Sequence, residues 1–429
     1  MEAKDLYSYF LKSTGVATDS RQIEEGTLFI CLRGEHFNGN RFAEEALEKG
    51  ASYVVVDDSE YFKEDKRYII VEDCLKSLQT LAHHHRMQFS IPVIGLTGSN
   101  GKTTTKELIN SVLSQQFNTT ATVGNLNNHI GVPLTLLNIN SKTAIALIEM
   151  GANHLKEIEI LAAIAAPTHG YITNFGKAHL EGFGSIEGVV RGKSELYQFL
   201  AKNSGICIIN SADPKQVSGT ENQETFSFGT DNTATVIIQN IDRRADENIV
   251  IRTEKTEIIS QLKGAYNFTN IAAAVAFGKY FKIATAKIKK GVEAYNPTNN
   301  RSQWYTTDSN TLVLDAYNAN PSSMKAALES FFSFKKEDQI LILGDMLELG
   351  SFADEEHQKI VDLIETKNIE KVLLVGPEFN KTKISTLGFK KFDNTTSAIP
   401  YLQKKNFQNK TILIKGSRGI ALEVLKDYL

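Results

Sequence analysis

The sequence lacks the features that mark secreted, membrane-spanning or zinc-binding proteins. Its three cysteines, Cys31, Cys74 and Cys207, are far apart and fit neither a zinc-ligand spacing nor a disulfide framework. A reducing cytoplasm is therefore the expected compartment. The first residues carry charges where a signal peptide would need an apolar run. No apolar stretch reaches the roughly 18 residues that a transmembrane helix requires, so we expect no membrane insertion.

An excess of charge of either sign is also missing. The chain has 47 Lys and Arg against 50 Asp and Glu, a formal net charge of −3. This balance provides no broad basic field for nucleic acid, which we exclude as a partner, but it permits a local anion site. Proline is scarce, at 8 residues, and apolar residues reach 41%, so disorder is not the dominant state. A length of 429 residues predicts two or three domains.

A first α/β domain is predicted over residues 1–90. Segments 27–32 and 52–56 are apolar and typical of buried strands, and 77–87 has a helical pattern. That helix carries three histidines in succession, His83–His85. Neighbouring residues on a helix point in different directions, so these three cannot chelate one metal. We expect them to form a solvent-facing helix end.

A central domain is predicted over residues 91–299, where strands alternate with helices. This alternation favours a parallel sheet with helices on its faces. One stretch, 223–263, looks instead like a β-rich excursion. The strands are expected at 93–96, 144–150, 170–175 and 205–210, and the helices at 103–117, 155–165 and 268–281.

The third domain, residues 300–429, repeats an apolar run followed by a polar loop. These runs are 311–315, 339–345, 371–376 and 411–416. Asn320 and Pro321 favour a helix start between the first two runs. The pattern is Rossmann-like, and in such folds ligands bind at the carboxyl ends of the strands. The predicted fold class is therefore α/β, with a central P-loop domain and a Rossmann-like third domain.

The strongest functional motif is GLTGSNGKTTT, residues 95–105. It follows a strand and opens a helix, so its backbone N–H groups and the helix N-terminus can cradle phosphate oxygens. Lys102 can reach the β- and γ-phosphates, and the Thr103 hydroxyl can bind Mg²⁺. The spacing departs from the common phosphate loop, because Leu96 stands where the first glycine is usual.

Three further residues are weak signals when taken singly. Glu149 closes the strand beside the phosphate loop, where a carboxylate can hold Mg²⁺. His179 lies in a loop and Lys193 in a helix, where such residues are usually structural or solvent-exposed.

These residues fall into one pattern, because the chain resembles the Mur ligase family, the ATP-dependent amino-acid ligases of peptidoglycan assembly. The phosphate loop has that family's form, with Leu at 96. The central-domain motifs are EMGA (149–152), ITNFGKAHLEGFGSIEG (172–188) and NFTN (267–270). Longer strings resemble the branch that adds D-alanyl-D-alanine to UDP-N-acetylmuramoyl-tripeptide. They are GNLNNHIGVPLTLL (124–137), DAYNANPSSM (315–324), GDMLELG (344–350) and KGSRG (415–419).

The resemblance implies a catalytic group of Lys102, His179 and Lys193, with two Mg²⁺ ions. Thr103 and Glu149 would hold the first ion and His179 the second. Lys193 matches the lysine that carries a carbamate in this family. Carbamylation converts the side-chain ammonium into an anion, and this anion can bind Mg²⁺. The residues implied for ATP are Gly98, Ser99, Asn100, Gly101, Lys102, Thr103, Thr104, Asn267, Asn270, Arg301 and Asp315.

The resemblance also implies one substrate site in each domain. In the first domain, the segments 19–21, with Ser20 and Arg21, and 32–35 would hold the uridine nucleotide. Residues Asn125, Asn127 and Asn128 would place the substrate near the γ-phosphate. The incoming dipeptide would face Asp345, Lys415, Ser417 and Arg418.

The sequence departs from the family pattern at three places. Leu314 stands where a second Asp is common, and Tyr266 stands where a His often precedes the Asn pair. The string NGN (38–40) replaces a DGH-like string in the first domain. The departure at Tyr266 leaves the adenine contacts undetermined, and the departure at NGN leaves the uridine contacts undetermined.

The implied reaction is amide-bond formation driven by ATP. A substrate carboxylate attacks the γ-phosphate to give an acyl phosphate and ADP, and the amine of the dipeptide then displaces phosphate. We expect a monomeric cytoplasmic enzyme of cell-wall biogenesis, with links to cell shape and division. No residue is evident that would accept the proton of the amine.

Two alternatives remain open. One is a related ligase, either a sibling that adds another amino acid or a folylpolyglutamate synthase, although the DNPR string typical of the diaminopimelate-adding sibling is absent. The other is a P-loop regulator, which would hydrolyse ATP without any acceptor.

Overall fold

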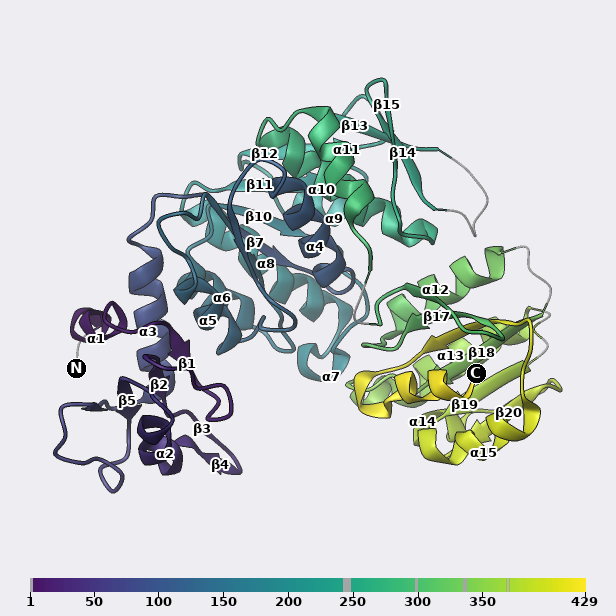
Figure 1. Ribbon diagram of the computed structural model, residues 1–429. Coiled ribbons are helices and arrows are strands. Elements are labelled where there is room, and N and C mark those ends of the chain that lie inside the picture. Colours follow the sequence, from purple (N-terminus) through teal and green to yellow (C-terminus); the bar gives the residue numbers. More distant parts are fainter. Residues whose placement is uncertain (1–2, 242–247, 298–299, 335–337, 368, 370) are drawn as a thin grey trace.

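The computed structural model describes residues 3–241, 248–297, 300–334, 338–367, 369 and 371–429. The chain forms three α/β units arranged in an arc, with the central unit between the other two (Figure 1). The expected boundary at residue 299 lies outside the described residues. No helix in the described ranges combines the length and apolar character needed to cross a membrane.

The first unit is built on a small parallel sheet with the strand order β1-β2-β5-β6. The expected strands at 27–32 and 52–56 are confirmed as β2 and β5. A short hairpin, β3 and β4, follows β2. The bounds are β1 Val16–Ala17, β2 Leu28–Ile30, β3 Arg33–Gly34, β4 Phe37–Asn38, β5 Tyr53–Val56, β6 Tyr68–Ile70, α1 Ala3–Phe10, α2 Ala43–Glu48 and α3 Cys74–Arg86.

Helix α3 joins the first unit to the central unit. Asp73 caps its N-terminus, because the Asp73 side chain accepts a hydrogen bond from the Lys76 amide. The helix packs on α5 and α6 of the central unit. The prediction that its histidines form a solvent-facing end was wrong for His85, which is only 5% exposed. His85 Nε2 lies 2.7 Å from the Ile139 carbonyl oxygen, because this helix end is covered by the central unit.

Within the described residues, the strands of the central unit form one sheet in the order β15-β14-β13-β12-β11-β10-β7-β9-β8. Neighbours from β13 to β8 run parallel, whereas β14 and β15 are antiparallel additions that confirm the predicted β-rich excursion. The bounds are β7 Val93–Thr97, β8 Thr119–Ala121, β9 Ile145–Glu149, β10 His169–Ile172, β11 Ile206–Asn210, β12 Thr225–Gly229, β13 Val236–Ile241, β14 Val250–Thr253 and β15 Thr256–Ile259.

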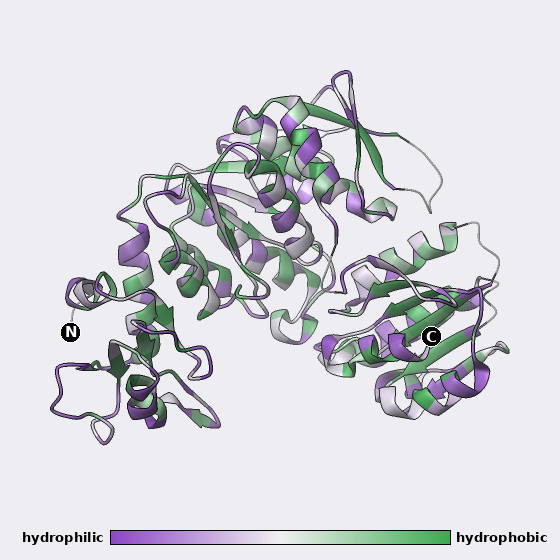
Figure 2. Ribbon diagram, in the orientation of Figure 1, coloured by the Kyte–Doolittle hydropathy of each residue, from purple (hydrophilic) through white to green (hydrophobic). Residues whose placement is uncertain are grey.

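Helices cover both faces of this sheet, and successive residues of β7 face opposite helices. Ile94 and Leu96 join one apolar cluster with α4, α10 and α11, whereas Val93 joins the cluster containing α5, α6 and α8. Figure 2 shows that the sheet strands are mostly hydrophobic, whereas the helices on either side of them mix hydrophobic and hydrophilic residues. The helices are α4 Lys102–Leu113, α5 Gly131–Leu137, α6 Glu157–Ala165, α7 Leu180–Phe183, α8 Ile186–Lys202, α9 Pro214–Ser218, α10 Phe268–Tyr280 and α11 Thr285–Ala294.

The third unit confirms the Rossmann-like pattern. Its strand order is β16-β17-β21-β18-β19-β20, parallel except for the β16–β17 pair. The four predicted runs are β17 Thr311–Asp315, β18 Gln339–Gly344, β19 Lys371–Val375 and β21 Thr411–Lys415. The remaining elements are β16 Gln303–Thr306, β20 Phe389–Phe392, α12 Pro321–Ser333, α13 Ala353–Glu365, α14 Pro377–Lys381 and α15 Thr395–Lys405.

Candidate functional site

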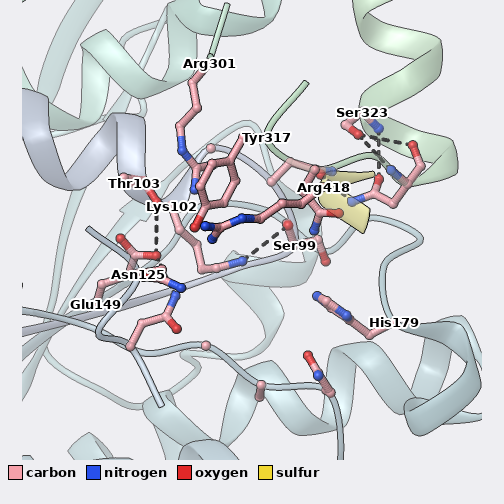
Figure 3. Close-up of a pocket in the computed structure, with 18 of the residues that line it drawn as sticks. Ser99, Lys102, Thr103, Asn125, Glu149, His179, Arg301, Tyr317, Ser323 and Arg418 are labelled. Carbon is pink, nitrogen blue, oxygen red and sulfur yellow. Dashed lines mark hydrogen bonds between the residues drawn. The ribbon is translucent and has the colours of Figure 1, made fainter. Parts of the chain in front are cut away.

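A cavity of about 1000 Å³ lies where the carboxyl ends of the central strands face the third unit, and it extends to α3 of the first unit. Figure 3 shows side chains of the central and third units converging on it. Most of the residues predicted for ATP line this cavity, including Ser99, Asn100, Lys102, Thr103 and Thr104. Two units therefore supply opposite walls of one site.

The phosphate loop connects β7 to α4, and its glycines have no room for a side chain. Gly98 and Gly101 have φ values of 143° and 77°, and glycine tolerates such values without strain. A Cβ on Gly98 would lie 1.9 Å from Thr173 Oγ1, and one on Gly101 would lie 2.6 Å from Asn270 Oδ1. The loop backbone therefore lies directly against its neighbours, at the N-terminus of α4, as an anion cradle requires.

Lys102 sits at the start of α4 and folds back over the loop. Its Nζ donates to the Gly98 carbonyl oxygen at 2.7 Å and lies 3.4 Å from that of Ser99 (Figure 3). Burial lowers the pKa of Lys102. The ammonium is held at the loop, where a phosphate chain would meet it.

Glu149 ends β9 and is almost fully buried, at 1% exposed. Its Oε1 accepts hydrogen bonds from Thr103 Oγ1 at 3.1 Å and from Asn127 Nδ2 at 2.9 Å. Its Oε2 has no hydrogen-bond partner among the described residues. A buried carboxylate oxygen left without a partner is costly. This pair of oxygens beside a threonine hydroxyl therefore fits a hard divalent cation.

The other predicted metal ligands, His179 and Lys193, each lie against other residues. Within the described residues, no three His, Cys, Asp or Glu side chains are grouped as a metal site. His179 lines the cavity, but its Nδ1 lies 2.5 Å from Glu348 Oε2 of the third unit. The proximity of His179 lowers the pKa of Glu348, although His179 Nδ1 makes no hydrogen bond of normal geometry with any described residue.

Lys193 is buried inside α8, behind the cavity wall. Its Nζ donates to the Ala152 carbonyl oxygen at 3.0 Å and lies 5.1 Å from the centre of the Phe183 ring. Burial, followed by the charge of Lys102, lowers the pKa of Lys193 well below its usual value. Burial therefore disfavours the charged form of this side chain.

The predicted adenine residues, Asn267 and Asn270, line the cavity and are joined by hydrogen bonds. Asn270 Nδ2 donates to Asn267 Oδ1 at 2.9 Å, and Thr105 Oγ1 donates to Asn270 Oδ1 at 3.0 Å. Tyr266, which replaces the more usual His, has its hydroxyl 2.8 Å from Ser302 Oγ. This last contact connects the central unit to the first residues of the third unit.

The wall contributed by the third unit is rich in cations. Arg301 stacks on the Tyr317 ring at 3.7 Å from its centre, and Arg418 lies 5.4 Å from the same centre (Figure 3). The Nε of Arg301 is buried without a hydrogen-bond partner among the described residues. Asp315 is paired with Lys415 at 2.5 Å and accepts from the Ser302 amide at 3.1 Å.

The structure corrects the prediction that Asp345 faces the dipeptide. Asp345 is fully buried and does not line the cavity. Its carboxylate accepts the amides of Glu378 and Phe379, at 2.8 and 2.9 Å, and so caps the start of α14. Its carbonyl oxygen accepts the Ser417 amide at 3.1 Å, so Asp345 shapes the 415–419 loop from behind.

The other predicted substrate residues differ in their surroundings. Asn125, Asn127 and Asn128 line the cavity, and Asn128 Oδ1 accepts two amides at the start of α5. Ser417 also lines the cavity and accepts from the Leu347 amide at 2.9 Å. Ser20 and Arg21 lie in the first unit, away from this cavity, and Arg21 extends into solvent with Asp19 as its partner.

Several contacts between the central and third units could not be inferred from the sequence. Asn320 Nδ2 donates to Asn100 Oδ1 of the phosphate loop at 2.7 Å. The Lys177 amide donates to Ser322 Oγ at 2.7 Å, and Lys177 Nζ lies 2.6 Å from Glu356 Oε1. The string AYNANPSS was visible in the sequence, but only the fold brings it against the phosphate loop.

A phosphate loop that faces two arginines across a cavity defines a nucleotide-binding α/β protein. Comparisons with known proteins identify the family to which this protein belongs. Three family models match: "Mur ligase family, catalytic domain" at residues 12–86, "Mur ligase middle domain" at 96–278, and "Mur ligase, glutamate ligase domain" at 300–418. Together they follow the three units in order.

Individual relatives match along almost the whole chain. A Bacillus subtilis (strain 168) protein named UDP-N-acetylmuramoyl-tripeptide–D-alanyl-D-alanine ligase is 36% identical over 97% of this chain and 93% of its own. Crystal structure I of MurF from Acinetobacter baumannii has a TM-score of 0.88 at 28% identity, covering 99% of this chain and 97% of that one. MurF ligase from Thermotoga maritima in complex with ADP has a TM-score of 0.85 at 24% identity, covering 98% and 97%. The chain belongs to the Mur ligase family.

Proposed function

We infer that this protein is an ATP-dependent ligase that joins D-alanyl-D-alanine to UDP-N-acetylmuramoyl-tripeptide. The observation that supports this most is one cavity walled by the phosphate loop and Glu149 on one side and by Arg301, Arg418 and Lys415 on the other. Such a cavity can hold ATP and a carboxylate together. The Bacillus subtilis relative is named for these two substrates, which supports assigning them to this chain.

The residues of the two walls divide the first step between them. Lys102 and the loop amides bind and orient the phosphates of ATP, while Arg301 approaches from the third unit. The tripeptide carboxylate then attacks the γ-phosphate, and ADP leaves with the bridging oxygen. Most of the acceleration comes from positioning and charge stabilisation, because phosphoryl transfer needs no protein nucleophile.

Two Mg²⁺ ions are part of this proposal. Thr103 and Glu149 would hold the first, which the unpartnered Glu149 Oε2 supports, and His179 would serve the second. When bound, Mg²⁺ would neutralise the charge that gathers on the transferring phosphoryl group. The residues for ATP are otherwise Gly98, Ser99, Asn100, Gly101, Thr104, Asn267, Asn270 and Asp315.

A carbamate on Lys193 is the further modification that we propose. Carbamylation requires the neutral amine to attack carbon dioxide, with loss of one proton. Burial of Lys193 favours that neutral amine. The product would carry an anionic group beside Ala152 and toward Lys102, where the free ammonium would repel a cation.

The second step joins the dipeptide to the activated carboxyl group. The dipeptide amine attacks the acyl phosphate carbon, and phosphate leaves when the tetrahedral intermediate collapses. Lys415, Ser417 and Arg418 would receive the dipeptide, and closure of the third unit would exclude water from the acyl phosphate. Ser20 and Arg21 would bind the uridine nucleotide in the first unit, with Asn125, Asn127 and Asn128 guiding the peptide between.

We propose three domains, residues 1–90, 91–299 and 300–429. The chain would act as a cytoplasmic monomer in peptidoglycan synthesis, and so in cell shape and division. Sedimentation of the purified protein checks the oligomeric state.

The deciding experiment measures phosphate release with ATP, Mg²⁺, UDP-N-acetylmuramoyl-tripeptide and D-alanyl-D-alanine, omitting each in turn. We expect turnover only with the complete set. Replacing the dipeptide by L-glutamate or a diamino acid tests the sibling ligases. Turnover that is independent of D-alanyl-D-alanine would reject the proposed acceptor, and hydrolysis without either substrate would favour a P-loop regulator.

A further inference from the structure

The side chain of Asn100, in the phosphate loop, is held by the third unit. Asn320 Nδ2 donates to Asn100 Oδ1 at 2.7 Å. The backbone of Asn100 is fixed instead within the central unit, because its amide donates to Asn174 Oδ1 at 3.1 Å and its carbonyl oxygen accepts from Thr173 Oγ1 at 2.6 Å. The central unit therefore sets the path of the loop, and the third unit sets the orientation of this side-chain amide.

The orientation of the Asn320 amide is itself fixed, because this residue caps α12. Its Oδ1 accepts from the Ser323 amide at 2.9 Å, and its backbone amide donates to Ser323 Oγ at 3.1 Å. Asn320 is 8% exposed. With its oxygen committed to the start of the helix, the group that Asn320 presents to the phosphate loop is the Nδ2 donor.

Gly176 lets the two units approach this closely. It lies between the phosphate loop and the first turn of α12, where a Cβ would be 2.9 Å from both Asn100 Nδ2 and Ser322 Oγ. The next residue joins the units directly, since the Lys177 amide donates to Ser322 Oγ at 2.7 Å. A side chain at position 176 would thus push against both partners of the contact.

We propose that Asn320 is a positioning residue that turns the Asn100 side chain into a hydrogen-bond donor for the nucleotide, a role that rests on the proposed binding of ATP at this loop. Asn100 lines the cavity. With Oδ1 bonded to Asn320, the part of the Asn100 amide left for a ligand is Nδ2, which carries two N–H donors. Phosphate oxygens only accept hydrogen bonds, so this orientation attracts the nucleotide, whereas the flipped amide would turn an oxygen toward it. The loop gains this donor only while α12 lies against it.

The helix cap allows the positioning role to be separated from folding. Serine caps a helix about as well as asparagine does, but it has no amide that could reach Asn100. Asn320→Ser should therefore leave the Tm unchanged, whereas Asn320→Ala, which also loses the cap, should lower it. Glu356→Ala is the matched control, because it removes an ion pair of 2.6 Å with Lys177 across the same boundary and leaves the Asn100–Asn320 bond in place.

The test measures binding of β,γ-imido-ATP, a non-hydrolysable ATP analogue, with Mg²⁺ by isothermal titration calorimetry of the full chain. We expect Asn320→Ser to weaken binding about tenfold, because a donor to a charged phosphate is lost. Glu356→Ala should stay within about threefold of the unmodified protein. In turnover, Asn320→Ser should raise the KM for ATP by a similar factor and keep kcat within about threefold, since the donor serves the ground state and the transition state alike.

A double-mutant cycle separates positioning from direct contact with the nucleotide. In the Asn100→Ala background, Asn320→Ser should cause no further loss of affinity. A further loss there, an unchanged affinity in Asn320→Ser alone, or an equal loss in Glu356→Ala would each overturn the proposal. If the unmodified protein binds the analogue but fails to turn over with D-alanyl-D-alanine, the proposed function fails instead, and the cycle still reports on this pair.

Discussion

The two walls of the cavity are built by different means. The central wall is built around a backbone loop that has no room for a Cβ at Gly98 or Gly101, together with Glu149, which is 1% exposed. The third-unit wall carries long cationic side chains, Arg301 and Arg418, which share the Tyr317 ring. A rigid wall can hold one partner in place, while a wall of arginines on a separate unit can approach later and complete the site.

Removing the charge of the rigid wall should have the largest effect. We expect Lys102→Met to lower kcat by about 10²–10³-fold, because it deletes a donor held at the phosphates. Phosphate release under saturating substrates measures this. Lys142→Met, at an exposed position, is the control and should behave like the unmodified protein. Activity of Lys102→Met within tenfold of normal would contradict the assignment.

The buried lysine behind the same wall comes next. Lys193→Ala should lower activity on the order of 100-fold, since an anion that supports a cation would be lost. Added formate or acetate should restore part of the lost activity, because a small carboxylate can occupy the space left by the Lys193 side chain. The control is Lys202→Ala, at the exposed end of the same helix. Full activity in Lys193→Ala would refute the carbamate.

Behind the third-unit wall, Asp345 should matter for stability rather than for binding. Asp345→Ala leaves the Glu378 and Phe379 amides without their acceptor, at a cost of about 1–3 kcal/mol. Thermal unfolding measures this, with Asp354→Ala, whose side chain is 78% exposed, as the control. A raised KM for the dipeptide with an unchanged Tm would restore the original prediction that Asp345 binds substrate.

The smallest effect on activity is expected from changing Tyr317, whose ring lies against both Arg301 and Arg418. Tyr317→Leu should raise the KM for ATP about threefold to tenfold, because the stacking of two guanidiniums on an aromatic face is lost. Tyr317→Phe keeps the face and should resemble the unmodified protein in steady-state kinetics. Equal losses in both variants would mean that the hydroxyl, not the ring, supports the arginines.

Sequence reasoning predicted the local elements of this protein, but it misplaced side chains whose surroundings come from distant segments. The phosphate loop, β9 with Glu149 and the Rossmann-like strands were predictable, since local chain order places a Gly-rich loop between a strand and a helix. Asp345 was misjudged, because its motif lies at a strand end but its side chain turns back to cap α14. His85 was misjudged for the same kind of reason: a distant segment, at Ile139, covers the helix end.

The sequence by itself determined the class of chemistry, because a loop that binds phosphate depends on consecutive residues whose spacing survives in any context. Only the tertiary structure decided which charged groups meet. The pairs His179–Glu348, Lys177–Glu356 and Asn100–Asn320 each join residues more than a hundred positions apart. Such contacts depend on how separate units pack, and side-chain pairing between units leaves no periodicity in the chain.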